Sequence, residues 1–121
     1  MSDLIRSSEC PEYYFEERCY IRELLNRESE PGVSIAQARV EPGVTTVLHS
    51  VKSTEVYYII SGTGRAEVGG HFYDVNPGDL IHITAEKPQR ITNTGANDLI
   101  FLAICAPRFT SENYTDLEEK L

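Results

Sequence analysis

The chain has 121 residues, a length that suits one domain with a single hydrophobic core. Its formal net charge of -8 argues against a nucleic-acid partner, which would require a basic face. No run approaches the roughly twenty apolar residues of a membrane-spanning helix, so no membrane partner is expected. The cysteines are odd in number and form no C-x-x-C pair, which predicts reduced thiols and a cytoplasmic location.

Residues 1–32 form an N-terminal extension whose structure is ambiguous from sequence. The segment 13–26, YYFEERCYIRELLN, could be a helix by propensity, with Tyr14, Ile21 and Leu25 in its apolar stripe. Much of the negative charge lies in this extension and in the last eleven residues, where we expect it to serve solubility.

From residue 33 to residue 105, short runs rich in Val, Ile, Thr and Tyr alternate with Gly, Pro, Asn and Asp. This pattern predicts an all-β sandwich or barrel over 33–107. Gly-Gly at 69–70 suits a hairpin turn with positive φ, and Asn-Pro-Gly-Asp at 76–79 suits a type II turn. The expected strands are 33–41, 44–51, 55–61, 64–69, 71–75, 79–84, 89–94 and 98–105.

The C-terminal tail, 108–121, carries a local helix signal. Thr115 and Glu118 have the spacing of a capping box, in which each side chain satisfies a backbone N–H of the first turn. The tail is therefore predicted to contain a short helix.

The segment from Gly43 to Gly62 contains a histidine and a carboxylate at a characteristic spacing. It resembles the first motif of the cupin superfamily, which is Gly, five residues, His-x-His, three or four residues, Glu, six residues and Gly. His49 and Glu55 match this motif. Val51 stands where the motif has its second histidine, which in the family is normally a metal ligand.

A second segment, from Gly70 to Gly95, resembles the second cupin motif, with its Pro-Gly-Asp turn, a proline and a later asparagine. Gln89 stands where the motif usually has histidine. The resemblance implies a cupin-type double-stranded β-helix, a jelly-roll barrel, and a strand near 18–25 as the alternative to the N-terminal helix. The stretch PQRITNTGANDLIFLAICAPRF resembles small bacterial single-domain cupins of the cupin 2 or mannose-6-phosphate isomerase-like group.

The candidate site follows from strand alternation within the implied barrel. His49 shares a face with Val51, Glu55 shares a face with Tyr57, and the resemblance places both sets inside with Gln89. Imidazole nitrogen, carboxylate and amide oxygen at His49, Glu55 and Gln89 could ligate Zn, Fe, Mn or Ni and leave positions open for water or substrate. Alternatively, the same three side chains could form a buried hydrogen-bonded network without a metal.

Other polar residues are weaker candidates for this site. Tyr57 could hydrogen-bond a ligand, although packing with a satisfied hydroxyl is the alternative. His82 is expected to face away from the core because isoleucines flank it, and His71 is expected to be a solvated hairpin residue. Cys105 is interpreted as a small buried apolar side chain.

The sequence is compatible with two functions. The first is a metal-dependent enzyme acting on a small polar organic molecule by isomerase or oxygenase-type chemistry, with Glu55 and Tyr57 as candidate catalytic residues. The second is a non-catalytic module that binds a sugar or another metabolite. Exposed sheet edges, together with the resemblance, predict a homodimer.

Overall fold

The computed structural model describes residues 3–118, and its regular elements are almost all strands. Single 3-10 turns lie at η1 (Ser7–Glu9) and η2 (Ser111–Asn113). No helix within 3–118 is long and apolar enough to cross a membrane. The strands are β1 (Glu12–Phe15), β2 (Cys19–Leu25), β3 (Ser34–Val40), β4 (His49–Val51), β5 (Thr54–Ser61), β6 (Gly64–Val68), β7 (His71–Val75), β8 (Leu80–Ile83), β9 (Gln89–Asn93), β10 (Leu99–Ala106) and β11 (Tyr114–Asp116).

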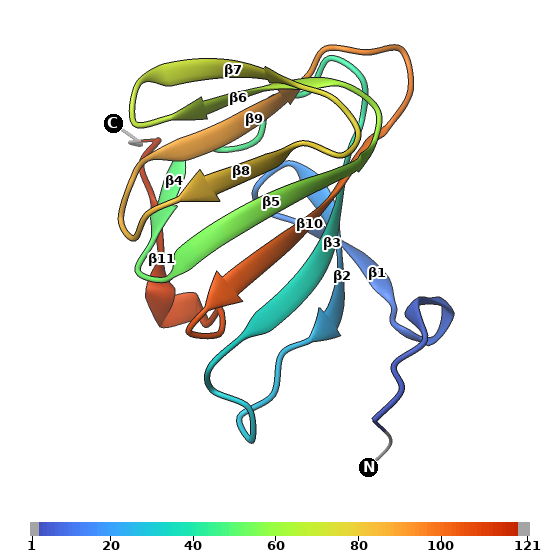
Figure 1. Ribbon diagram of the computed structural model, residues 1–121, viewed down its shortest axis with the longest axis vertical. Coiled ribbons are helices and arrows are strands. Elements are labelled where there is room, and N and C mark those ends of the chain that lie inside the picture. Colours follow the sequence, from blue (N-terminus) through green and yellow to red (C-terminus); the bar gives the residue numbers. More distant parts are fainter. Residues whose placement is uncertain (1–2, 119–121) are drawn as a thin grey trace.

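The strands form two antiparallel sheets that enclose one core (Figure 1). One sheet has the order β1-β2-β3-β10-β5-β8 and the other has the order β11-β4-β9-β6-β7. Alternate side chains point inward, as along β5 and β9, where buried and more exposed residues alternate. The all-β prediction is confirmed. The most deeply buried apolar side chains between the sheets include Val40, Ile59, Ile91 and Leu99.

Two tight turns follow the sequence chemistry. Gly69 and Gly70 both have positive φ, 56° and 83°, in the hairpin between β6 and β7. Gly78 has φ of 93°, and the amide of Asp79 donates to the carbonyl of Asn76 at 3.0 Å across the 76–79 turn. Residues other than glycine rarely adopt such φ values, so glycine is favoured at these positions.

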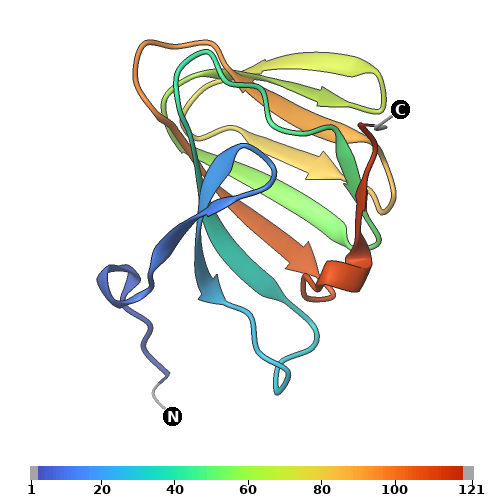
Figure 2. The ribbon, with the colours of Figure 1, turned by 180° about the vertical axis from the view of Figure 1, so that it is seen from behind.

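The N-terminal segment forms a hairpin and contains no α-helix, so the helix interpretation of 13–26 is wrong. Strands β1 and β2 pair with each other, and β2 continues the sheet by pairing with β3, which confirms a strand near 18–25. The turn of this hairpin lies against the chain that precedes β4, because the amide of Val47 donates to the carbonyl of Glu17 at 3.1 Å. In Figure 2, which views the molecule from behind, the blue hairpin lies in the foreground.

The C-terminal tail also departs from its local signal. The predicted helix at Thr115 and Glu118 is wrong: the only helical element of the described tail is η2, and β11 follows it directly. Thr115 lies opposite Ser50 because β11 pairs with β4, which satisfies backbone groups that a helix would leave at the sheet edge. The expected strand 44–51 is likewise shorter, with only His49–Val51 in β4. Residues 119–121 lie outside the described part of the chain.

Candidate functional site

His49 lies at the start of β4 and is almost completely buried. Its Nδ1 donates to the carbonyl oxygen of Val47 at 2.7 Å. A carbonyl can only accept, so Nδ1 carries the proton and Nε2 of the neutral ring is an acceptor. Burial lowers the pKa of His49, and the Val47 carbonyl and the charge of Asp116 oppose this shift only in part. His49 is therefore a neutral base whose free nitrogen points into the protein.

The partner of that nitrogen is Glu17, a residue that the sequence did not single out. Oε2 of Glu17 lies 3.1 Å from Nε2 of His49, and Glu17 comes from the turn between β1 and β2. Burial, helped by the charge of Glu55, raises the pKa of Glu17 to about 8, although hydrogen bonds with Tyr114 and Cys19 oppose the shift. Because Nε2 is an acceptor, the carboxyl group donates its proton to it.

Tyr114 of β11 covers the other side of the imidazole. Its ring stacks on His49 with centroids 5.1 Å apart and planes 18° apart. Tyr114 also packs edge-on against Phe15 at 6.0 Å and Phe109 at 6.2 Å. The C-terminal strand therefore helps to hold His49 and the N-terminal hairpin together.

Glu55, on β5 in the facing sheet, is 6% exposed. Within residues 3–118, its Oε1 is buried without a hydrogen-bond partner. Burial raises the pKa of Glu55 to about 7 against the opposing effects of the Gln89 amide and the Cys105 thiol. These two groups therefore lie close enough to act on Glu55, yet they leave Oε1 without a bond of standard geometry. An unpaired buried oxygen costs free energy, so it requires an explanation.

Gln89 and Tyr57 form a direct link between the sheets. The Tyr57 hydroxyl donates to Oε1 of Gln89 at 2.5 Å, and both side chains are buried. Nε2 of Gln89 has no hydrogen-bond partner among the described residues. Gln89 also lies directly opposite His49 in the β4–β9 register. The structure thus brings His49, Glu55, Tyr57 and Gln89 to one region of the interior, with Glu17 added to them.

Gln89, the metal ligand that the motif implies, turns its amide oxygen toward Tyr57 in the structure. Its oxygen accepts from Tyr57, and the amide atom left free is Nε2, a donor that cannot bind a cation. Val51 is buried at 3% exposure and supplies no donor atom. No three His, Cys, Asp or Glu side chains within 3–118 are grouped so that they could hold one ion. The trio His49, Glu55 and Gln89 therefore stays a prediction as a set of metal ligands.

The weaker candidates lie where strand alternation puts them. His71 and His82 are exposed, and Cys105 is buried. Arg39 forms ion pairs with Glu12 at 2.9 Å and with Asp98 at 3.2 Å, and it does not line a cavity with Glu55.

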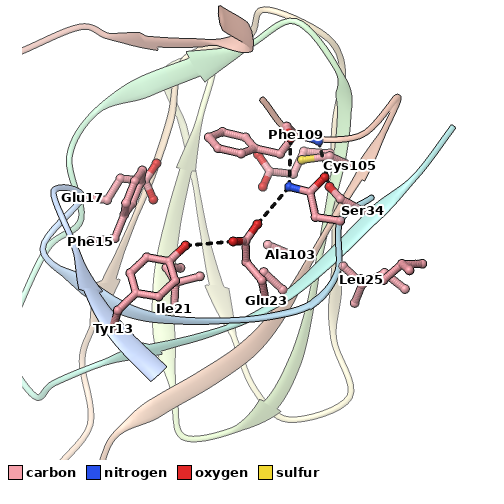
Figure 3. A pocket seen from close by; sticks show the side chains of 14 residues that line it. Tyr13, Phe15, Glu17, Ile21, Glu23, Leu25, Ser34, Ala103, Cys105 and Phe109 are labelled. Carbon is pink, nitrogen blue, oxygen red and sulfur yellow. Dashed lines mark hydrogen bonds between the residues drawn. The ribbon is translucent and has the colours of Figure 1, made fainter. Parts of the chain in front are cut away.

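A cavity of about 80 Å³ reaches Glu17 and Glu55. Residues of β1, β2, β3, β5 and β10 line it, together with Phe109 (Figure 3). Its apolar wall includes Phe15, Ile21, Leu25, Ala103 and Phe109; its polar wall includes Tyr13, Glu17, Glu23, Asn26, Ser34, Glu55 and Cys105.

The exposed Glu23 is held in place by two neighbours on this wall. Its carboxylate accepts from the Tyr13 hydroxyl at 3.4 Å and from the Asn26 amide at 2.9 Å. Asn26 also donates to the carbonyl of Phe109 at 3.0 Å. Figure 3 shows Tyr13 and Glu23 facing each other across these bonds. The acidic groups on the cavity wall therefore range from the exposed Glu23 to the half-buried Glu17 and the buried Glu55.

Residues 36–105 match the family model described as a cupin domain, which is more than half of the chain. The chain belongs to the cupin family. It is 35% identical over 109 residues to an uncharacterized protein of Methanocaldococcus jannaschii, covering 88% of this cupin and 87% of that protein. It is 33% identical over 70 residues to an oxalate-binding protein of Thermotoga maritima, covering 57% of this cupin and 58% of that protein.

Solved structures agree with the family assignment. A predicted oxalate decarboxylase of Thermotoga maritima has a TM-score of 0.78 at 26% identity and covers 86% of this cupin and 98% of that chain. The polyketide cyclase RemF of Streptomyces resistomycificus has a TM-score of 0.82 at 15% identity, covering 99% of this cupin and 88% of that chain, a likeness of fold alone. Glu17 lies outside the matched segment 36–105, which is why the family motif gave no signal for it.

Proposed function

We propose that this cupin binds a small polar organic molecule in the cavity, with Glu17 and Glu55 as its inner polar contacts. The supporting observation is the unpaired, buried Oε1 of Glu55 on the cavity wall. Small-molecule sites are mostly apolar with a few placed polar groups, and this cavity has that composition. A bound molecule that donates a hydrogen bond to Oε1 would remove the cost of leaving this oxygen unpaired.

The Glu17–His49 pair gives the same cavity a group that can hold or release a proton. Oε2 of Glu17 and Nε2 of His49 share one proton across 3.1 Å, and Glu17 lines the cavity. Acid–base transfer of the isomerase type needs such a group within reach of the bound molecule. Glu17 would be the residue that contacts the molecule, and His49 would act through it. Tyr57 is left with a structural role, because its hydroxyl is committed to Gln89.

Binding is tested by amide chemical shifts in a screen of small uncharged, cationic and anionic compounds. We expect at least one class to shift the amides of Ser34, Ala103 and Cys105 together, since all three residues line the cavity. Glu55→Gln should weaken that response, whereas the charge-matched control Glu41→Gln, at an exposed residue, should leave it unchanged. A screen in which no class shifts these amides would reject the proposal.

Divalent metal binding is the second candidate function. The observation in its favour is the 3.1 Å between Nε2 of His49 and Oε2 of Glu17, because neighbouring donors around an ion with bonds of about 2.1 Å lie roughly 3 Å apart. Oε1 of Glu55 is the further free acceptor of this region. Elemental analysis of protein purified without a histidine tag tests it. One equivalent of Zn, Fe, Mn or Ni that is lost in His49→Ala would support it, and an unchanged metal content would reject it.

We also propose that the protein is a homodimer formed through the outer face of the six-stranded sheet. Tyr58 and Ile60 of β5 and Leu80 of β8 are 41%, 43% and 58% exposed, although they are large and apolar. A second copy would cover this surface and the free edge of β8. Light scattering should give twice the 13.6 kDa mass of one chain, and the Tyr58→Glu variant should give the mass of a single chain. A monomer mass for the unchanged protein at micromolar concentration would overturn the proposal.

A further inference from the structure

The ionisable side chains that the described residues contribute to the cavity wall include carboxyl groups and no basic group. Three carboxyl side chains line it, those of the buried Glu55, the half-buried Glu17 and the exposed Glu23, and no Lys, Arg or His of residues 3–118 lines it. We propose that the molecule bound here is a small organic cation, an alkylammonium of about five heavy atoms. This inference rests on the proposed binding function and assigns its ligand class.

Glu55 supplies the observation that an acidic cluster alone would lack. Its side chain is buried, lines the cavity, and leaves Oε1 without a partner. An ammonium group has three N–H donors and no acceptor, so it complements a wall whose unsatisfied atom is an acceptor. Oε1 of Glu55 would accept from the ammonium group, and Glu17 lies on the same wall to accept a second bond. If the proton moves from the ammonium group to Glu55, a neutral amine faces a carboxylic acid. The total charge of the pair is then unchanged, and the two groups can still form a hydrogen bond.

Aromatic rings on the wall add a second feature that favours a cation. Phe15 and Phe109 both line the cavity, and their rings meet edge to face with centroids 6.5 Å apart and planes 85° apart. A cation over an aromatic face is attracted by the ring quadrupole, so a ring face turned to the ligand would favour a cation. Ile21 and Leu25 continue the apolar wall and would pack against the alkyl chain.

The size of the cavity limits the ligand. A water-sized group needs roughly 10–15 Å³ of such volume, so about 80 Å³ holds a ligand of about five to eight heavy atoms. An n-butylammonium ion, with five, fits this limit. Glu23 is exposed and held by Tyr13 and Asn26, so it would attract a cation toward the cavity. An anion of the same size would meet three carboxyl groups and no basic side chain on the wall.

The test compares three ligands of one shape on the unchanged protein: n-butylammonium, 1-butanol and butyrate. Each is titrated at pH 7 while the amide signals of Ser34, Ala103 and Cys105 are followed. We expect n-butylammonium to shift these signals and to bind at least tenfold more tightly than 1-butanol, and we expect butyrate not to bind. Glu55→Gln should weaken n-butylammonium binding at least tenfold, and the exposed, charge-matched Glu41→Gln should change it less than twofold.

The outcomes separate this inference from the proposed function. If 1-butanol or butyrate binds at these residues as tightly as n-butylammonium, the cation inference is overturned and small-molecule binding stands. If none of the three shifts these signals, the cation inference is overturned, and the wider compound screen decides the proposed function alone. The comparison of ligands uses only the unchanged protein, so a variant that fails to fold does not weaken it.

Discussion

Replacing Glu55 with methionine should make the protein more stable. Glu55→Met keeps the length of the side chain and removes both carboxylate oxygens, including the buried Oε1 that has no partner within 3–118. Leaving a buried polar group unpaired costs about 1–3 kcal/mol. Methionine is flexible and apolar, so it can fill the same space beside Cys105 and Tyr57, which are also buried. Residues kept at a cost in stability are typical of functional sites.

The expected gain is about 1–2 kcal/mol in the free energy of unfolding. It is smaller than the full cost of the unpaired oxygen, because the substitution also leaves or creates unfavourable contacts. Nε2 of Gln89 stays unpaired after the substitution, and Glu55 loses its contacts with the Gln89 amide and the Cys105 thiol. Urea denaturation at pH 7, followed by circular dichroism, measures this free energy, with the slope checked for constancy.

A matched control is available at Glu67, whose carboxylate accepts from Arg90 at 2.7 Å. Glu67→Met removes a satisfied and partly exposed carboxylate, so it should be neutral or destabilising by up to about 1 kcal/mol. If Glu55→Met instead lowers the free energy of unfolding by 1 kcal/mol or more, Oε1 is satisfied in the protein and the reasoning fails.

Three further predictions concern the neighbours of the site. Tyr57→Phe removes the donor to Gln89 and should destabilise the protein by about 1–3 kcal/mol in urea denaturation; a smaller loss would mean that this bond contributes little. Val51→His adds an imidazole at a buried position of β4 and should raise Ni²⁺ affinity at least tenfold in calorimetry, and no gain would count against metal binding near His49. Arg18 and the amide of Leu48 lower the pKa of Glu118, so the stability from this contact is present above pH 4.5 and lost as the pH falls through the lowered pKa. Glu118→Gln should remove about 0.5–1 kcal/mol at pH 7 and almost nothing at pH 2, and an equal loss at both pH values would contradict this.

The sequence predicted the residues that strand alternation and the family motif control. His49, Glu55, Tyr57 and Gln89 all lie inside, because one face of each strand must pack on the core. The turn glycines were also predictable, since positive φ excludes most other residues. In both cases the deciding interaction is local or repeats along a strand.

Glu17 and the tail could not be predicted, because long-range contacts decide them. Glu17 meets His49 only after the hairpin folds against the chain before β4, and by propensity the segment 13–26 could also be a helix. The capping signal at Thr115 was overridden by pairing with Ser50, which lies far away in sequence. Gln89 was placed correctly by its motif, but its bond to Tyr57, which decides its chemistry, was not foreseen.

A high-resolution crystal structure of the protein soaked with n-butylammonium tests the central claim most directly. We expect the ligand in the cavity, with its nitrogen within about 3.2 Å of Oε1 of Glu55 and its alkyl chain against Ile21 and Leu25. A cavity that holds no ligand after the soak, with ordered water molecules donating to Oε1 instead, would contradict the cation proposal.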